Sequence, residues 1–336
     1  MRIRSMHNVL IALSIAVAGL GVACNKGGGG IGGAGAGGAT ASAMDKLPKE
    51  TSVLVGFSWA KFKDSKLFTM LQSAVPEQSK AELQKLKDAC QVDFMNDLDS
   101  LLVASGGNME KDRTLIFVKG KWDEDKINKC ATAMGQKENK KITSAKDGAI
   151  TTYQVEGEQP VHVAWQGDTI VLTPAAMEGD KTYLADMLKQ KSSIKENAPF
   201  MEILGKVDTG STLWAAVLVP PDNAELAGMT NKMTGGTEKL QAGWLSLKLG
   251  KDLDCNGGMR FGNEAEAKTV AEKLTKELEG AKADPTAGEY LKSLTVAQAG
   301  NEVTFKLALS EAQVDKLLEM AKQMLPMLGM MMGGGL

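Results

Sequence analysis

The strongest constraint on the fold is a pattern of short β-rich runs and amphipathic helices that recurs in the two halves of the chain. The segment DTIVLTPAAMEGDKTYLADMLKQ from Asp168 reads like NEVTFKLALSEAQVDKLLEMAKQ from Asn301, since each is a strand that turns into a helix. RTLIFVKGKWDEDKINKC and CNGGMRFGNEAEAKTVAE are likewise both a strand, a polar turn and a helix. We interpret these segments as parts of two divergent β-α-β-β-α-β-β-α repeats, although amphipathic helices can also resemble one another by chance.

The order of the elements indicates the fold class. Strand-like runs over residues 141–173 are separated by the turn-like segments KDG, GEQ and QGD, which favours antiparallel pairing. Helices are expected after Asp123, over Asn263–Gly280 and over Glu311–Leu325, and Ser52–Ser58 is expected to be a buried strand. The sequence therefore predicts an α+β fold with mainly antiparallel sheets and helices packed on one face. It leaves open whether the repeats form one sheet or two.

The expected domain organisation follows from changes in composition. We expect repeat 1 over residues 46–195, repeat 2 over residues 196–325, and a tail rich in Met and Gly over residues 326–336. Residues 24–45 contain a Gly/Ala-rich run that cannot bury enough apolar surface to fold, and this indicates a flexible tether. The run matches GxGxxG at Gly30, Gly32 and Gly35, but the strand that a dinucleotide site requires does not precede it.

Residues 1–23 have the organisation of a secretory signal peptide. Arg2 and Arg4 precede an uncharged apolar stretch that ends in small residues at Ala23 and Cys24. The stretch is shorter than the roughly 20 residues that a membrane-spanning helix needs. A cut at another small residue, such as Ala18, is the alternative.

The residues Gly21, Val22, Ala23 and Cys24 resemble the lipobox of bacterial lipoproteins, although Gly21 replaces the usual aliphatic residue. The resemblance implies that Cys24 receives a diacylglycerol, becomes the new N-terminus and anchors the protein to a membrane. Asn25 stands where the inner-membrane retention signal of that family has aspartate, which favours the outer membrane, with the body in the periplasm or on the cell surface. The body also resembles uncharacterised tandem-repeat α+β lipoproteins of bacteria such as the myxobacteria.

Composition and charge exclude several classes of protein. Hydrophobic residues make up 43% of the chain and charged residues 24%, as in soluble globular proteins. The net charge is −2, and removal of Arg2 and Arg4 with the signal peptide would make the mature chain more acidic still. Because a basic surface is needed to bind phosphate backbones, we expect no nucleic-acid partner.

The chain has four cysteines, so three remain if Cys24 is lipidated. We favour a disulfide between Cys90 and Cys130, because both lie near expected helix ends in the same half, and this would leave Cys255 as an unpaired thiol. The alternative is that all three are small buried residues.

The residues that commonly carry catalysis are sparse. Only His162 remains after signal cleavage, which excludes sites with several histidines in one chain. Two DLD segments place Asp97 with Asp99, and Asp252 with Asp254, on one side of an extended chain. Such acids could hold calcium or act with His162 in an unrecognised periplasmic hydrolase, but they are also typical of solvated strand ends.

The C-terminal tail is rich in methionine at Met320, Met324, Met327, Met330, Met331 and Met332. Thioether sulfurs suit copper(I), so soft-metal handling is one hypothesis, and contact with lipid or protein is another. The plainest interpretation is a helix end that packs on the core.

Taken together, these features predict a non-catalytic envelope lipoprotein that binds an envelope protein or an apolar ligand, or has a structural role. We expect no cofactor and no resident metal.

Overall fold

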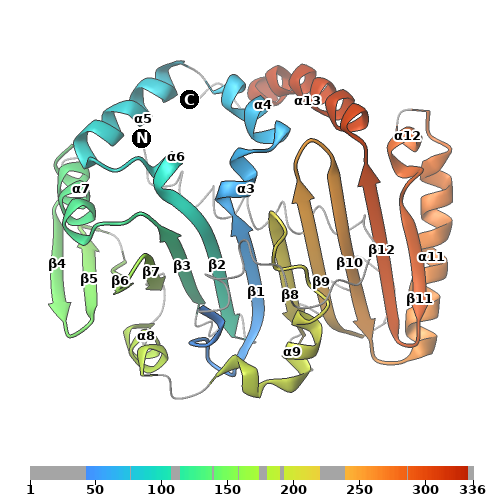
Figure 1. Ribbon diagram of the computed structural model, residues 1–336, viewed down its shortest axis with the longest axis horizontal. Coiled ribbons are helices and arrows are strands. Elements are labelled where there is room, and N and C mark those ends of the chain that lie inside the picture. The colour runs from blue at the N-terminus through green and yellow to red at the C-terminus, as the bar shows by residue number, and fades with distance from the viewer. Residues whose placement is uncertain are drawn as a thin grey trace.

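The computed structural model describes residues 43–75, 77–106, 114–137, 140–157, 159–173, 180–189, 193–219, 239–285 and 287–331. In these residues the chain forms a twelve-stranded sheet together with helices (Figure 1). Each strand pairs with its neighbours in antiparallel orientation. The predicted α+β class and antiparallel pairing are therefore confirmed. The strands of both halves belong to one sheet.

The strand order is β11-β12-β10-β9-β8-β1-β2-β3-β7-β6-β5-β4. The first strands of the two halves, β1 and β8, meet at the centre, so the halves lie side by side, and β11 and β4 are the two edges (Figure 1). The strands are β1 (Thr51–Ser58), β2 (Leu98–Gly106), β3 (Thr114–Gly120), β4 (Ile142–Asp147), β5 (Ile150–Val155), β6 (Val161–Gln166), β7 (Thr169–Thr173), β8 (Leu213–Leu218), β9 (Leu240–Leu249), β10 (Leu253–Phe261), β11 (Thr295–Ala299) and β12 (Glu302–Leu309).

Polar side chains fix the starts of several helices. Ser65 accepts a hydrogen bond from the backbone N–H of Phe68, and Asn263 accepts one from Glu266 at the start of the helix over Glu264–Lys282. The helices are α3 (Trp59–Lys63), α4 (Lys66–Ala74), α5 (Glu77–Cys90), α6 (Phe94–Asp97), α7 (Glu124–Lys137), α8 (Asp180–Leu188), the 3₁₀ turn η2 (Ile194–Glu196), α9 (Ala198–Leu204), α11 (Glu264–Lys282), α12 (Gly288–Leu291) and α13 (Glu311–Met331). The helical backbone of α13 thus continues beyond Leu325, where the sequence predicted its end.

The helices lie on both faces of the sheet. Lys146 and Asp147 are consecutive in β4, so their side chains point to opposite faces. Lys146 pairs with Glu124 of α7 at 3.0 Å, whereas Asp147 pairs with Lys181 of α8 at 2.8 Å. The prediction that the helices pack on one face is therefore wrong. The physical reason is that the central strands carry apolar side chains on both faces of the sheet, so removal of either face from water is favourable.

The largest apolar cluster lies between one face of the sheet and helices α8 and α9. Ala43 and Leu47, at the beginning of the described residues, belong to it and are 9% and 0% exposed. The fully buried large side chains of the cluster are Leu47, Leu54, Leu115, Val171, Leu184, Ile194, Phe200 and Ile203. Burial of residues from both halves in one cluster joins the halves into a single core.

Two buried tryptophans on this face each pack their indole ring over a glycine of the neighbouring strand. Trp214 is directly opposite Gly56, and Trp244 is directly opposite Gly258. A Cβ atom on either glycine would overlap the facing indole ring. The absence of a side chain at Gly56 and Gly258 therefore makes the space that the two indoles fill.

The opposite face carries a second apolar cluster made only of strand residues. Its buried members are Ala215, Leu245, Leu247, Cys255 and Phe305. Cys255 is 5% exposed and is disulfide-bonded. The prediction that Cys255 is an unpaired thiol is therefore wrong.

A disulfide joins Cys90 at the end of α5 to Cys130 in α7, with 4.2 Å between the two Cα atoms. It is the pair that the sequence analysis favours. Both cysteines are buried, at 2% and 4% exposed, in a small cluster that includes Val92. The bond fixes the packing of α5 against α7, which is far from the sheet centre.

Candidate functional site

A cleft of about 630 Å³ opens where β2 begins and β3 ends. Helices α3 and α6, the turn that follows β3 and the turn between β6 and β7 complete its walls. The lining residues are Ala60, Lys63, Asn96, Asp97, Leu98, Asp99, Lys119, Gly120, Lys121, Trp122, Gly167 and Asp168. One of the two DLD acid pairs predicted from the sequence is thus part of a cleft.

Backbone hydrogen bonds hold the floor of this cleft. The N–H of Gly120 donates to the carbonyl of Asp168 at 3.0 Å, and the N–H of Lys121 donates to the carbonyl of Asp97 at 2.8 Å. A Cβ on Gly120 would overlap the carbonyl oxygen of Asp97 and the ring of Trp122. Glycine is therefore required at this position, and the backbone carrying the side chains of the cleft is preformed.

Helix α6 on one wall is held by two aspartates. The backbone N–H of Asp93 donates to the carboxylate of Asp97 at 2.8 Å. Asp93 in turn accepts from the backbone N–H of Asn96 at 3.2 Å and pairs with Lys87 at 2.6 Å. The hydrogen bond from Lys87 and those from Asn96 lower the pKa of Asp93 to about 2. Asp97 thus stabilises the start of helix α6, which is a structural role.

The charges of the cleft are only partly paired. Lys119 pairs with Asp168 at 3.3 Å. Lys63, Lys121 and Asp99 form no ion pair with any other described residue. The cleft therefore offers two lysines and one aspartate to a ligand.

The indole ring of Trp122 lines the cleft beside these charges. The indole N–H of Trp122 donates to the carbonyl of Val118 at 3.0 Å, which fixes the ring. The ring of Phe94, a residue that is 38% exposed, is 6.3 Å from the Trp122 ring, centroid to centroid. An apolar surface is thus available next to the unpaired charges.

The structure does not bring His162 together with the predicted acids. His162 lies on β6 and its Nδ1 is 2.9 Å from the hydroxyl of Thr152 on β5. Strand β6 is three strands from β2, where Asp99 lies, or about 14 Å at the usual strand spacing. Asp252 and Asp254 are at the start of β10, on the other side of the sheet centre. A His–Asp site of the kind considered for a hydrolase is not assembled by these residues.

Two other predicted features fall wholly or partly beyond the described residues. Cys24, the predicted lipidation site, precedes them. Met320 lies on α13, but the side chains of Met324, Met327, Met330 and Met331, and all of Met332, are outside them. In the part of the chain that is described, His, Cys, Asp and Glu side chains form no group of three or more that could hold a metal ion.

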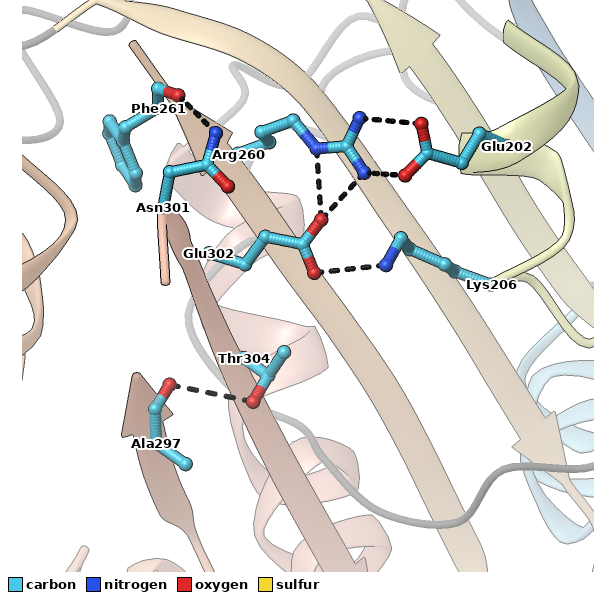
Figure 2. A network of polar contacts seen from close by, with 8 residues as sticks. All are labelled: Glu202, Lys206, Arg260, Phe261, Ala297, Asn301, Glu302 and Thr304. Atoms are coloured by element: carbon cyan, nitrogen blue, oxygen red, sulfur yellow. Dashed lines mark hydrogen bonds and ion pairs between the residues drawn. The ribbon is translucent and has the colours of Figure 1, made fainter. Parts of the chain in front are cut away.

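A second polar cluster, which the sequence did not indicate, ties α9 to β10 and β12 (Figure 2). The guanidinium of Arg260 forms hydrogen bonds to both carboxylate oxygens of Glu202 and, through Nε at 2.9 Å, to Glu302. Lys206 pairs with Glu302 at 2.9 Å, and its Nζ lies 5.2 Å from the centroid of the Trp244 ring. Two positive and two negative groups compensate each other, so this cluster is a structural cross-link.

Replacement of Arg260 by Met is expected to destabilise the protein by about 2 kcal/mol, because it leaves the partly buried Glu302 without its main partner. Arg260 and Glu302 are only 17% and 18% exposed. The free energy of unfolding from urea denaturation checks this. Lys268→Met, which removes an exposed 4.0 Å pair on α11, is the control and should change stability by less than about 0.5 kcal/mol. Equal effects of the two substitutions would contradict a cross-linking role.

The same network predicts a pH dependence. The hydrogen bonds from Arg260 lower the pKa of Glu202. A carboxyl group whose pKa is lower in the folded state stabilises the fold above its unfolded pKa, and this contribution is lost as the pH falls through the folded value. The stability difference between wild type and Arg260→Met should therefore shrink below about pH 4.

Comparisons with known proteins assign no family. No known protein family matches the chain, and no curated protein matches it. Among solved structures it is similar to TP0453 in crystal form III, at 12% identity and a TM-score of 0.48, over 81% of this chain and 95% of that chain. Crystal forms I and IV of TP0453 give TM-scores of 0.46 and 0.44, at 11% and 12% identity, over 82% of this chain and 95% of each of those chains. Likeness at this level assigns neither a family nor a function.

Proposed function

We propose that the protein is a lipoprotein of the bacterial cell envelope, tethered through Cys24, whose body is a non-catalytic binding or structural module. The observation that carries the binding role is the cleft at the ends of β2 and β3. Its lining offers charged, amide and aromatic side chains, and it contains no serine, threonine, cysteine or histidine among the described residues. Such a lining can hold a ligand by charge and by stacking.

The membrane tether is supported by the sequence that precedes the body. The lipobox-like residues from Gly21 to Cys24 follow an apolar stretch, and a Gly/Ala-rich run separates them from the buried Ala43. No helix in the described part is both long and apolar enough to cross a membrane. A lipid on Cys24 would supply a membrane attachment, and the tether would let the body reach roughly 20–25 Å away from the surface.

The proposal also includes two divergent repeats. In each half the first strand pairs with the second, the second with the third, and the third with the strand that precedes the last helix of that half. The four strands are β1, β2, β3 and β7 in the first half, and β8, β9, β10 and β12 in the second. The third strand of each half leads into a helix, α7 or α11. This shared order supports a duplication, with β4, β5 and β6 as the larger insertion.

The experiment for the tether is the mass of the N-terminal peptide from membrane-fractionated cells. Wild type should carry a diacylglycerol on Cys24 and sediment with membranes. Cys24→Ser should lose both the lipid and the membrane association, because serine has no sulfur to accept the lipid. Asn25→Gln is the matched control and should keep them.

A single sulfur forms either a thioether to lipid or a disulfide, so the proposed anchor requires that Cys255 forms its disulfide with a cysteine other than Cys24. A digest of the membrane fraction that contained a disulfide-linked Cys24–Cys255 peptide pair, with no acylated peptide, would overturn the proposed anchor. That result would not bear on the binding role of the body, which a separate experiment tests.

A further inference from the structure

We infer that the cleft between β2, β3, α3 and α6 binds a short peptide or amino acid that carries both a carboxylate and an ammonium group. This inference rests on the proposed binding role but not on the lipid anchor. A volume of about 630 Å³ is within the range of small-molecule sites, which is roughly 300–1,000 Å³.

The distribution of charge selects a ligand with both signs. Among the described residues Lys63 and Lys121 form no ion pair and can attract an anionic group, whereas Asp99 forms none and can attract a cationic group. A multiply charged anion such as phosphate would meet the aspartates of the same cleft, and a simple cation would meet its lysines. A molecule with one carboxylate and one ammonium satisfies all three unpaired groups.

The lysines and the aspartate come from separate elements that the backbone holds in fixed relation. Lys63 ends α3, Asp99 is the second residue of β2, and Lys121 follows β3. The hydrogen bond from the N–H of Lys121 to the carbonyl of Asp97 joins the segment after β3 to the end of α6, which leads directly into β2. Little backbone ordering is therefore needed when a ligand binds, which favours measurable affinity for a small molecule.

The ring of Trp122 favours a ligand that has an aromatic or apolar side chain. Trp122 lines the cleft and is fixed by its hydrogen bond to Val118, whereas Phe94 packs beside it outside the lining. An aromatic or apolar side chain placed next to the carboxylate can contact the ring of Trp122. Alanyl-phenylalanine, which has both charges and one ring, is therefore a suitable probe.

The test is a titration of the purified full chain with alanyl-phenylalanine, followed by calorimetry and by amide NMR shifts. We expect saturable shifts centred on Gly120, Lys121 and the indole N–H of Trp122. N-acetylation of the probe removes the contact with Asp99, and C-terminal amidation removes those with Lys63 and Lys121, so each should weaken binding at least about 5-fold. Inorganic phosphate and acetate should not displace the dipeptide at equal concentration.

Substitutions in the protein test which residue binds the carboxylate of the dipeptide and which binds its ammonium group. Lys121→Gln should weaken binding of both the free and the N-acetylated dipeptide about 5-fold. Asp99→Asn should weaken only the free dipeptide, because the acetylated form lacks the ammonium group. Lys146→Gln, an exposed lysine at the β4 edge that pairs with Glu124, is the matched control and should leave binding unchanged.

Three outcomes would overturn the inference: no saturable shift at millimolar dipeptide, equal binding of the blocked and free forms, or full competition by phosphate alone. The last result would indicate a simple anion site. None of these results depends on the mass of the Cys24 peptide, so failure of the ligand and failure of the anchor can be told apart.

Discussion

Replacement of Trp214 by alanine is expected to lower the free energy of unfolding by about 3–5 kcal/mol. Trp214 is 2% exposed at the centre of the sheet, where β8 of the second half meets β1 of the first. Its indole fills the space above Gly56, so the smaller side chain leaves a cavity in the cluster that joins the two halves. Urea denaturation followed by circular dichroism measures the effect.

The glycine on the other side of this contact allows a stricter test. Gly56→Ala should destabilise wild type by about 1–3 kcal/mol, because its Cβ must displace a buried ring. In the Trp214→Ala background the same substitution should be much less harmful, since the ring is gone. Gly243→Ala is the matched control in β9, because its Cβ would meet only an ordinary contact at 3.8 Å and should change stability by less than about 0.5 kcal/mol. Additive effects of Gly56→Ala and Trp214→Ala would contradict the proposed packing.

Removal of the Cys90–Cys130 disulfide is the second large effect that we expect. The two cysteines are separated by 40 residues in sequence. Cross-linking a loop of this length restricts the unfolded chain by about 3–4 kcal/mol in the chain-entropy description. The variant Cys90→Ala/Cys130→Ala should therefore unfold at a distinctly lower urea concentration than wild type.

The single substitutions supply the control for this prediction. Cys90→Ala and Cys130→Ala each break the same bond, so each should destabilise the protein nearly as much as the double variant does. If the two single effects were small and simply added up, the cysteines would contribute through packing rather than through the cross-link. Unfolding of all variants should be measured without reductant, because Cys255 is also disulfide-bonded.

Local chemistry made several elements predictable from the sequence. The strand expected over Ser52–Ser58 is β1, and the helix expected after Asp123 is α7, whose Lys126 N–H is capped by that aspartate at 2.9 Å. Turn residues and hydrophobic alternation act over a few residues, so they are visible in one sequence. The favoured disulfide also depended on a local clue, namely that both cysteines are near helix ends in one half.

The candidate site was only partly predictable. The DLD segment at Asp97 and Asp99 drew attention to the right strand end, but its partners Lys63 and Lys121 come from elements that the sheet brings together. The second DLD segment has the same sequence but lies at the start of β10 and does not line this cleft. The difference is set by the neighbouring elements and not by the motif.

By itself, the sequence determined the class of fold, the antiparallel pairing and the position of most helices, because these follow from periodicity, capping and turn residues. Only the tertiary structure decided that the two halves share one sheet, that helices cover both faces, and that Arg260 joins α9 to β10 and β12. It also decided that Trp214 lies over Gly56. The physical reason is that such contacts join residues from 22 to 158 positions apart, whose approach depends on the packing of the whole chain rather than on any local pattern.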